Sequence, residues 1–237
     1  MMDALLAECS GYENFSILSV GSGSGLFEVP MLRRLLAAGK RVARFTGVDI
    51  DEDANQLLRA ALDDEFGNLL DFEIVSDSFG AFDPKVRAEI ILYNHVFEYI
   101  REGHLDWMEK SLRMLAEGGK LLLFSPIQGG INAIYEDNMS EHFDYAPYYS
   151  ADIEKMLLDA GISFTKESIR GECDISLLDE VHSDTDAMKL LSFLTQVDCR
   201  KIPADQIAEQ VKYFQSLRGN GSALIPHPTD FFILTTQ

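Results

Sequence analysis

The sequence predicts an α/β fold, a mostly parallel sheet with helices on both faces. Three observations predict it: apolar runs alternate with amphipathic segments, a glycine-rich turn follows the first run, and an acid ends the second. Strands that alternate with helices are typical of a parallel sheet. The predicted strands of the first half lie near 16–20, 43–49, 72–76, 89–94 and 119–125. The predicted helices between them lie near 26–39, 52–64 and 103–116.

The second half of the sequence has a less regular pattern. We expect a long loop over 126–149, and the run 117–120 predicts a helix stop that leads into the strand at 119–125. The 237 residues, 46% of them hydrophobic, can bury one sizeable core, so we expect a single domain with its cofactor-binding half at about 1–125 and its substrate side at about 126–237. The remaining predicted helices lie near 151–160, 185–196 and 204–217, and the last predicted strand is 231–234.

The glycine turn and the second strand indicate a nucleotide-type cofactor. Glycines at 21, 23 and 25 let backbone N–H groups approach a ligand, because glycine tolerates positive φ and has no Cβ. Asp49 stands where such folds bind ribose hydroxyls. A dinucleotide fingerprint requires Gly or Ala at position 26, which is Leu26. A nicotinamide-dependent oxidoreductase is therefore the weaker alternative.

The G-x-G-x-G pattern resembles motif I of the class I S-adenosylmethionine (SAM) methyltransferases. The resemblance implies a Rossmann-like, seven-stranded sheet, SAM as cofactor and S-adenosylhomocysteine as product. It also implies that the turn lies close to the methionine part of the cofactor and that Asp49 takes both ribose hydroxyls. The cofactor-binding residues predicted here are Gly21, Ser22, Gly23, Gly25, Asp49 and Ile50.

Ligands of open α/β sheets bind beyond the carboxyl ends of the strands, so the residues just after each strand are further candidates. After the third strand, Asp77 and Ser78 are expected to meet the adenine, or else to form only a solvated loop. After the fourth strand, Tyr93 and Asn94 are expected to contact the cofactor. Asn94 and His95 are the predicted catalytic residues, although a lone histidine beside a strand is more often structural.

The excess of acidic over basic residues limits the classes of ligand that the protein is expected to bind. The chain has 20 basic and 39 acidic residues, a net charge of −19, which repels phosphate backbones and disfavours a nucleic-acid partner. It favours a small, cationic substrate, or it serves solubility alone. Three widely spaced cysteines form neither a disulfide framework nor a metal site, and we see no membrane span and no signal peptide. We therefore expect a cytoplasmic protein, a monomer or weak homodimer.

Segments 173–176, 190–195 and 231–233 resemble the histamine N-methyltransferase family in order and spacing. The resemblance implies transfer of a methyl group to a nitrogen of an amine or imidazole. It places His95 at a substrate-contacting glutamine of that family, Tyr135 at an aromatic wall residue and His227 near a substrate-contacting asparagine. Ile131 stands where the family has a second aromatic residue. The family's N-terminal helical segment, with a glutamate that helps hold histamine, has no counterpart in this sequence.

The expected substrate-binding residues are Asn94, His95, Glu98, Tyr135, His142 and His227. For a primary amine, the candidate proton acceptors are His95, His142 and Glu98. Aromatic residues of the 129–149 loop either wall the substrate or simply pack the loop. Two alternative functions stay open: another small-molecule methyltransferase, such as an O-methyltransferase, and a catalytically inactive binding protein with this fold.

Overall fold

The computed structural model describes residues 1–83, 87–133, 146–180, 185–195, 197–219 and 222–236. The chain forms two compact units. The first contains Met1–Ser125, Lys155–Glu167 and Phe231–Gln237, and the second contains Pro126–Glu154 and Ser168–Asp230.

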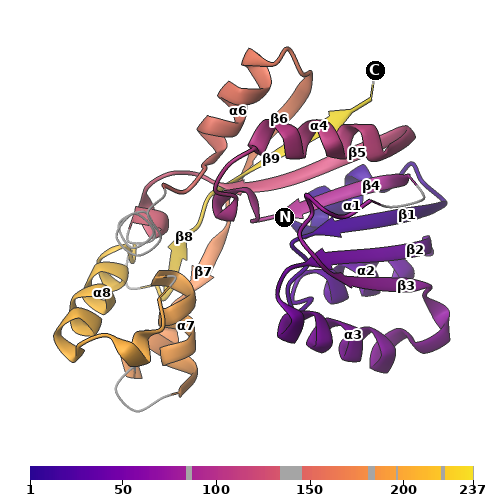
Figure 1. Cartoon of the computed structure of the whole chain (residues 1–237). Coiled ribbons are helices and arrows are strands. Elements are labelled where there is room, and N and C mark those ends of the chain that lie inside the picture. The colour runs from indigo at the N-terminus through magenta and orange to yellow at the C-terminus, as the bar shows by residue number, and fades with distance from the viewer. Residues whose placement is uncertain (84–86, 134–145, 181–184, 196, 220–221, 237) are drawn as a thin grey trace. The chain divides into compact units, whose positions relative to one another are not determined.

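The principal sheet has seven strands in the order β3-β2-β1-β4-β5-β9-β6 (Figure 1). The pairs β1–β2, β1–β4, β2–β3 and β4–β5 are parallel. This topology confirms the predicted Rossmann-like, mostly parallel sheet. Its strands are β1 (Asn14–Val20), β2 (Arg41–Asp49), β3 (Phe72–Ser76), β4 (Ala88–Asn94), β5 (Leu115–Pro126), β6 (Phe164–Ile169) and β9 (Thr229–Thr235).

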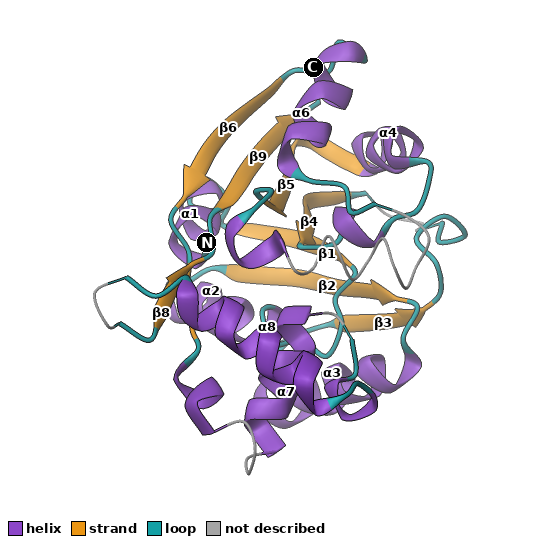
Figure 2. Cartoon of the chain, turned by 90° about the vertical axis from the view of Figure 1, so that its left-hand side faces the viewer, coloured by secondary structure: helices purple, strands orange, loops and turns teal. Residues whose placement is uncertain are grey.

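Helices connect the parallel strands. The pairs β1–β2 and β2–β3 advance across the sheet in one direction and β4–β5 in the other, so right-handed crossovers place α2 and α3 on one face and α4 on the opposite face. Figure 2 shows these helices in purple around the orange strands. The helices of the first half are α1 (Met2–Glu8), α2 (Glu28–Ala37), α3 (Glu52–Phe66) and α4 (His104–Met114).

The central strands are buried on both faces. In β4, the residues Ile90, Ile91, Leu92 and Tyr93 are each no more than 1% exposed. Continuous apolar runs of this kind are expected where helices cover both sides of a parallel sheet. The core therefore fixes β1 and β4 side by side, with their carboxyl ends at the same edge.

Several predicted boundaries differ from the structure. The helix predicted over 103–116 ends at Met114, and β5 begins at Leu115, so Gly118 and Gly119 lie inside a strand and are not a helix stop. The register between β4 and β5 shifts between Ala88 and Ile90, opposite these glycines. A Cβ on Gly119 would lie 2.9 Å from the Glu89 carbonyl oxygen, so this close approach requires glycine. The helix at the N-terminus, α1, and the strand β6 were not predicted.

The second unit has a small core of its own. Its helices α7 (Thr185–Thr195) and α8 (Ala204–Ser216) contribute Leu191 and Phe214 to one buried cluster. The strands β7 (Glu172–Asp174) and β8 (Leu224–Pro226) pair in antiparallel fashion. Helix α6 (Ser150–Asp159) lies near the predicted bounds 151–160. In the part of the chain that the structure describes, no helix is long and apolar enough to span a membrane.

Candidate active site

The glycine turn lies at the carboxyl end of β1, beside the end of β2. The Gly21 N–H donates to the Val48 carbonyl oxygen over 2.7 Å, which joins the turn to the neighbouring strand. Asp49 Oδ2 accepts a hydrogen bond from the Gly23 N–H over 2.8 Å, and its Oδ1 accepts one from the Asp51 N–H over 2.9 Å. The predicted pair of glycine turn and strand-end acid is therefore assembled in the first unit.

Two glycines of the turn are required by close packing. Gly21 has φ +68°, and a Cβ there would lie 2.6 Å from Val96 Cγ2. Gly25 has φ +82°, and a Cβ there would lie 2.4 Å from Leu58 Cδ1. Val96 belongs to the segment after β4, so this segment packs directly against the turn. The turn and the predicted catalytic segment are thus neighbours.

Asn55, which the sequence analysis missed, holds the ends of β2 and β3 together. Its side chain is fully buried, and its Nδ2 donates to the Asp49 carbonyl oxygen at 2.9 Å and to Ser76 Oγ at 3.1 Å. The next residue of the β3 end, Asp77, donates its N–H to the same Asp49 carbonyl oxygen over 3.1 Å. The Asp77 backbone therefore lies close to Asp49, and its contact with adenine stays a prediction.

The other predicted cofactor residues near these strand ends are exposed. The Ile50 side chain is 78% exposed beside Asp49. Asp77 Oδ1 accepts from the Ser78 N–H, and Ser78 Oγ accepts from the Ala81 N–H, so both side chains stabilise their own loop. A ligand would meet them at the surface.

Tyr93 lies inside the core. Its side chain is fully buried, and its hydroxyl is 2.7 Å from Ser111 Oγ on α4. Burial raises the pKa of this phenol far above its usual value. Because successive side chains of a strand point to opposite faces, the Tyr93 ring packs against the helix layer, and only its backbone is placed near the strand end.

Three polar residues lie at the end of β4 and in the segment that follows it: Asn94, His95 and Glu98. The His95 N–H donates to the Phe124 carbonyl oxygen of β5 over 3.0 Å. His95 Nδ1 lies 3.3 Å from Glu98 Oε1, and the Glu98 side chain is 4% exposed, against 21% for His95. The Glu98 side chain is therefore more deeply buried than the His95 side chain.

The His95 backbone has φ +56°, and no other non-glycine residue in the described ranges has a positive φ. This left-handed conformation costs roughly 1–2 kcal/mol for a residue with a Cβ. Strained backbone that the surroundings maintain is concentrated at functional sites. The sequence alone does not predict this conformation, because only a few per cent of non-glycine residues have a positive φ, even though histidine is enriched among them.

The strand ends contain buried polar atoms that the described protein leaves without hydrogen bonds. They are Ser22 Oγ in the turn, Asn94 Oδ1, Glu98 Oε2 and Ser125 Oγ. Buried polar atoms are normally satisfied, so an unsatisfied group here fits a site that a polar ligand completes. Asp49, whose carboxylate can accept from ribose hydroxyls, and Ser22 of the glycine turn together fit the ribose and amino-acid parts of SAM.

Glu28, at the start of α2, was also missed by the sequence analysis. It is 3% exposed, and its Oε1 accepts from Ser19 Oγ of β1 over 2.9 Å. Burial raises the pKa of this carboxyl to about 7, while hydrogen bonds from Ser19 and from nearby backbone N–H groups lower it in part. The sequence shows only an acid in the first turn of a helix, which is usually a solvated residue.

The remaining predicted residues lie in the second unit or outside the described residues. Tyr135 and His142 lie outside the described residues, as do Phe143 and Tyr145. His227 belongs to the second unit, where its N–H donates to the Gly171 carbonyl oxygen over 2.8 Å. Within the described ranges, no cluster of His, Cys, Asp and Glu side chains is arranged to hold a metal ion.

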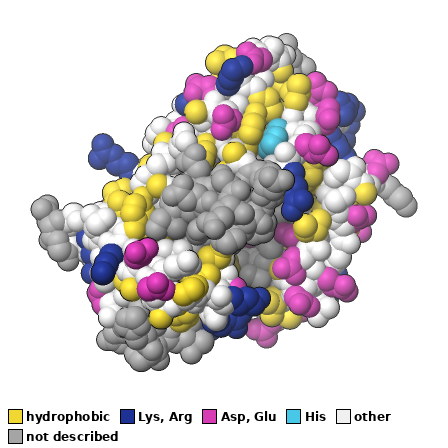
Figure 3. All heavy atoms as spheres, turned by 60° about the vertical axis from the view of Figure 1, so that its left-hand side comes forward, with side chains coloured by type: hydrophobic (Ala, Val, Ile, Leu, Met, Phe, Trp, Pro, Cys, Tyr) yellow, Lys and Arg dark blue, Asp and Glu magenta, His cyan; other side chains and the backbone are white. Residues whose placement is uncertain are grey.

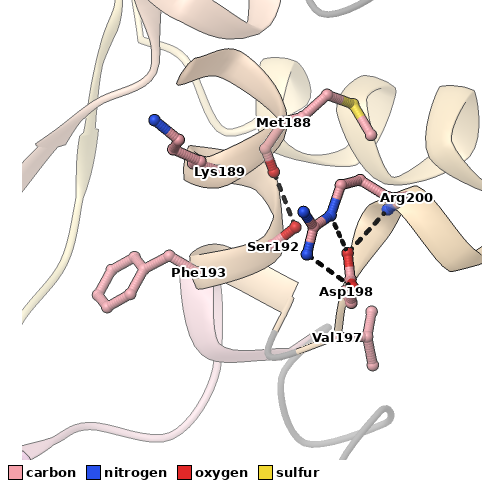
Figure 4. A pocket seen from close by; sticks show the side chains of 7 residues that line it. All are labelled: Met188, Lys189, Ser192, Phe193, Val197, Asp198 and Arg200. Carbon is pink, nitrogen blue, oxygen red and sulfur yellow. Dashed lines mark hydrogen bonds and ion pairs between the residues drawn. The ribbon is translucent and has the colours of Figure 1, made fainter. Parts of the chain in front are cut away.

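A pocket of about 640 Å³ lies in the second unit and contains none of the predicted residues in its lining (Figure 4). Arg200 and Asp198 form an ion pair there, with Nε and Oδ1 at 2.7 Å, and this pairing lowers the pKa of Asp198. Phe193 is 63% exposed beside it. The lining residues are Met188, Lys189, Ser192, Phe193, Val197, Asp198 and Arg200.

The sequence was compared with family models. The family described as "Methyltransferase domain" matches residues 2–165, which include the glycine turn, Asp49 and the segment after β4. The chain belongs to this methyltransferase domain family. This membership and the geometry of the strand ends support SAM as the cofactor. No match was found among the curated proteins.

Solved structures resemble this methyltransferase over nearly its whole length. A SAM-dependent methyltransferase from Thiobacillus denitrificans, in complex with S-adenosyl-L-homocysteine, has a TM-score of 0.58 at 12% identity, with 100% of this chain and 90% of that chain covered. Phosphoethanolamine N-methyltransferase 2 of Haemonchus contortus, in complex with SAM, has a TM-score of 0.61 at 16% identity, with 100% and 52% covered. Coclaurine N-methyltransferase, bound to N-methylheliamine and SAH, has a TM-score of 0.61 at 12% identity, with 99% and 72% covered. These identities establish the fold, and the resemblance to histamine N-methyltransferases stays a prediction.

Proposed function

We propose that this methyltransferase transfers the methyl group of SAM to a nitrogen of a small amine or imidazole. The observation that carries the proposal is the polar group after β4. Asn94 ends β4, and His95 and Glu98 belong to the following segment, which packs on the glycine turn through Val96. Polar groups at this position meet the acceptor where the methyl group is delivered.

The chemistry of the side chains suits a nitrogen acceptor. When bound, SAM supplies an electrophilic methyl group on a positively charged sulfur. Asn94 Oδ1, buried and without a described partner, can accept an N–H of the acceptor and so orient it. Alignment of two reactants in this way contributes roughly 7–11 kcal/mol to the lowering of a barrier. An imidazole nitrogen can react with orientation alone.

A primary amine also needs a group that accepts its proton. An alkyl amine with a pKa near ~10.4 is protonated at neutral pH, and its deprotonation at pH 7 costs about 4.6 kcal/mol. A proton acceptor at the site shifts this balance, and His95 and Glu98 stand there together. The net charge of −19 would also attract a cationic acceptor.

The names of two similar solved structures also support a nitrogen acceptor. Two of the solved structures named above are N-methyltransferases by name, one for phosphoethanolamine and one named for coclaurine. Both structures cover essentially all of this chain. We propose on the same ground that the two compact units serve one catalytic domain.

The test is detection of methylated product by mass spectrometry. The purified protein is incubated with SAM and a panel that contains histamine, imidazole, ethanolamine, catechol and benzoate. We expect a mass gain of one methyl group on an amine or imidazole. A methylated phenol or carboxylate would overturn the nitrogen acceptor, and SAM binding with no product across amines and imidazoles would favour the binding-protein alternative.

A further inference from the structure

We infer that Glu28 is a specificity-determining residue, whose buried negative charge at the base of the glycine turn favours SAM over S-adenosylhomocysteine. SAM has a positively charged sulfur, and methyl transfer leaves a neutral thioether in S-adenosylhomocysteine. The inference depends on the proposed binding of the cofactor at the glycine turn, and it is independent of the identity of the methyl acceptor.

The Glu28 carboxyl connects the two ends of the glycine turn. The turn joins β1 to α2, and Ser19 lies near the end of β1, whereas Glu28 is the first residue of α2. Glu28 Oε1 accepts from Ser19 Oγ over 2.9 Å, and the backbone N–H groups of Phe27 and Glu28 also donate to this carboxyl. Donors on both sides of the turn therefore fix the carboxyl at its base.

Burial of Glu28 prevents direct contact with a ligand but strengthens the field of its charge. Glu28 is 3% exposed, and no lysine or arginine of the described ranges forms an ion pair with it. A buried charge is screened less by water and salt than an exposed charge. Glu28 therefore acts on a cofactor at the turn by electrostatic attraction and not through a hydrogen bond.

Asp49 places a second negative charge at the same turn. Its Oδ2 accepts from the Gly23 N–H over 2.8 Å, and Asp49 is close enough for its charge to act on Glu28. The two carboxylates repel each other when both are ionised. A cofactor with a positive charge reduces this repulsion, whereas one with a neutral thioether does not.

The charge of Glu28 changes near neutral pH. Burial, and to a smaller extent the charge of Asp49, raise the pKa of the Glu28 carboxyl to about 7, while hydrogen bonds from Ser19 and from backbone N–H groups lower it in part. The carboxyl is therefore mostly neutral at pH 6 and mostly ionised at pH 8. Because SAM favours the ionised form, its affinity should rise with pH through about 7.

The cost of this charge to stability separates a role in binding from a role in folding. Ionisation of a buried carboxyl lowers the free energy of unfolding, and a neutral glutamine can accept from Ser19 without that cost. Residues that reduce stability are expected at functional sites. Glu28→Gln should therefore be more stable than the wild type at pH 8 and yet bind SAM more weakly.

The first experiment measures the charge of Glu28 directly. ¹³C NMR of protein labelled at the glutamate carboxyl carbon follows ionisation, and the Glu28 signal is the one lost in Glu28→Gln. We expect a midpoint near pH 7 in the free protein and a midpoint lower by about 1 pH unit with saturating SAM. S-adenosylhomocysteine should lower the midpoint by less than about half as much. Equal midpoints with the two ligands would overturn the inference.

The second experiment measures the Kd of SAM and of S-adenosylhomocysteine by calorimetry at pH 6 and pH 8. We expect Glu28→Gln to weaken SAM binding about 10-fold at pH 8 and about twofold at pH 6, and to weaken S-adenosylhomocysteine binding by less than about threefold at both. The amino group of each ligand also titrates, but this effect is common to all variants and cancels in the comparison.

Glu52→Gln, at an exposed glutamate that is the first residue of α3, is the matched control and should leave every Kd unchanged. Urea unfolding at pH 8 establishes that Glu28→Gln is folded. If the ratio of the two Kd values at pH 8 is the same in Glu28→Gln as in the wild type, the charge of Glu28 does not select SAM and the inference is overturned.

Ser19→Ala keeps the carboxyl and removes one of its donors. Because the Ser19 hydrogen bond lowers the pKa of Glu28, its loss should move the rise in SAM affinity to higher pH. A rise that stays at the wild-type pH would contradict the role of Glu28. Failure of the proposed cofactor site gives a different result, since Asp49→Asn would then also leave SAM affinity unchanged.

Discussion

At the residue scale, Asp49 shows how one side chain joins two parts of the candidate site. Its two oxygens accept from the backbone N–H groups of Gly23 and Asp51, so its carboxylate is held against the glycine turn. A carboxylate with spare acceptor capacity can still take two hydroxyl groups of a ribose. The same bonds that order the turn therefore position the carboxylate that we expect to bind the ribose.

Replacement of Asp49 by asparagine should weaken SAM binding by about 10- to 100-fold, because hydrogen bonds to a charged group are each worth about 1.5–3 kcal/mol. Isothermal titration calorimetry measures the Kd. Asp53→Asn, at an exposed acid in the first turn of α3, is the control and should leave the Kd unchanged. Unaltered SAM affinity in Asp49→Asn would contradict the ribose assignment.

The raised pKa of Glu28 predicts how the free energy of unfolding changes with pH. Burial raises the pKa of its carboxyl from an ordinary value of 4.5 to about 7, so the folded protein keeps this proton to a higher pH than the unfolded chain does. The Glu28 contribution to the free energy of unfolding is therefore fully present below about pH 4.5 and declines as the pH rises to about 7. The shift corresponds to roughly 3 kcal/mol.

Urea unfolding at a series of pH values from 4.5 to 8 tests this. Glu28→Gln should remove the Glu28 part of the decline and should be more stable than the wild type at pH 8. Glu52→Gln, at an exposed glutamate in the first turn of α3, should keep the wild-type profile. A wild-type slope that persists in Glu28→Gln would show that another group causes the decline.

At the element scale, the glycine turn and the segment after β4 act as a packed pair. Gly21 has a positive φ, and Val96 Cγ2 occupies the space that a Cβ would need. The turn consequently cannot change without moving the segment that carries Asn94 and His95. This contact joins the predicted cofactor-binding turn to the predicted catalytic segment.

Gly21→Ala should lower the free energy of unfolding by about 2–4 kcal/mol, from backbone strain and overpacking together. In a Val96→Ala background the penalty should shrink by about 1 kcal/mol or more, because the methyl groups that clash are gone. Gly23→Ala is the matched control, since its φ is also positive but no atom lies within 4 Å of its added Cβ. Equal penalties for Gly21→Ala in both backgrounds, measured by urea unfolding, would exclude the packing explanation.

At the scale of the whole molecule, charge is the dominant feature. The net charge is −19, and Figure 3 shows acidic side chains spread over one face of the protein. A field of this sign raises the local concentration of cations and the rate at which they bind. SAM carries a net positive charge at neutral pH, whereas S-adenosylhomocysteine has none.

Association of SAM should therefore slow on the order of 10-fold when the salt concentration rises from about 0.01 M to 0.1 M, as the Debye length falls from about 30 to 10 Å. Association of S-adenosylhomocysteine should change much less. Stopped-flow fluorescence or surface plasmon resonance gives both rates. The same salt dependence for the two ligands would show that long-range attraction is absent.

The sequence by itself determined the order of strands and chemical groups along the chain. Period-two and continuous apolar runs predicted β1 to β5, and parallel strands end at a common edge, so Gly23 and Asp49 could be paired although 26 residues separate them. Local patterns carry this information because a strand or helix depends on its own residues. The resemblance to motif I then predicted that the turn binds SAM.

Only the tertiary structure decided which side chains meet. The burial of Glu28 and Asn55, the contact between Val96 and Gly21, and the left-handed backbone of His95 have no local signature. Tyr93 illustrates the reason, since it was predicted at the cofactor and the strand alternation turned its ring into the core beside Ser111. Burial and contact are set by residues far away in the chain, whose approach depends on how the layers pack.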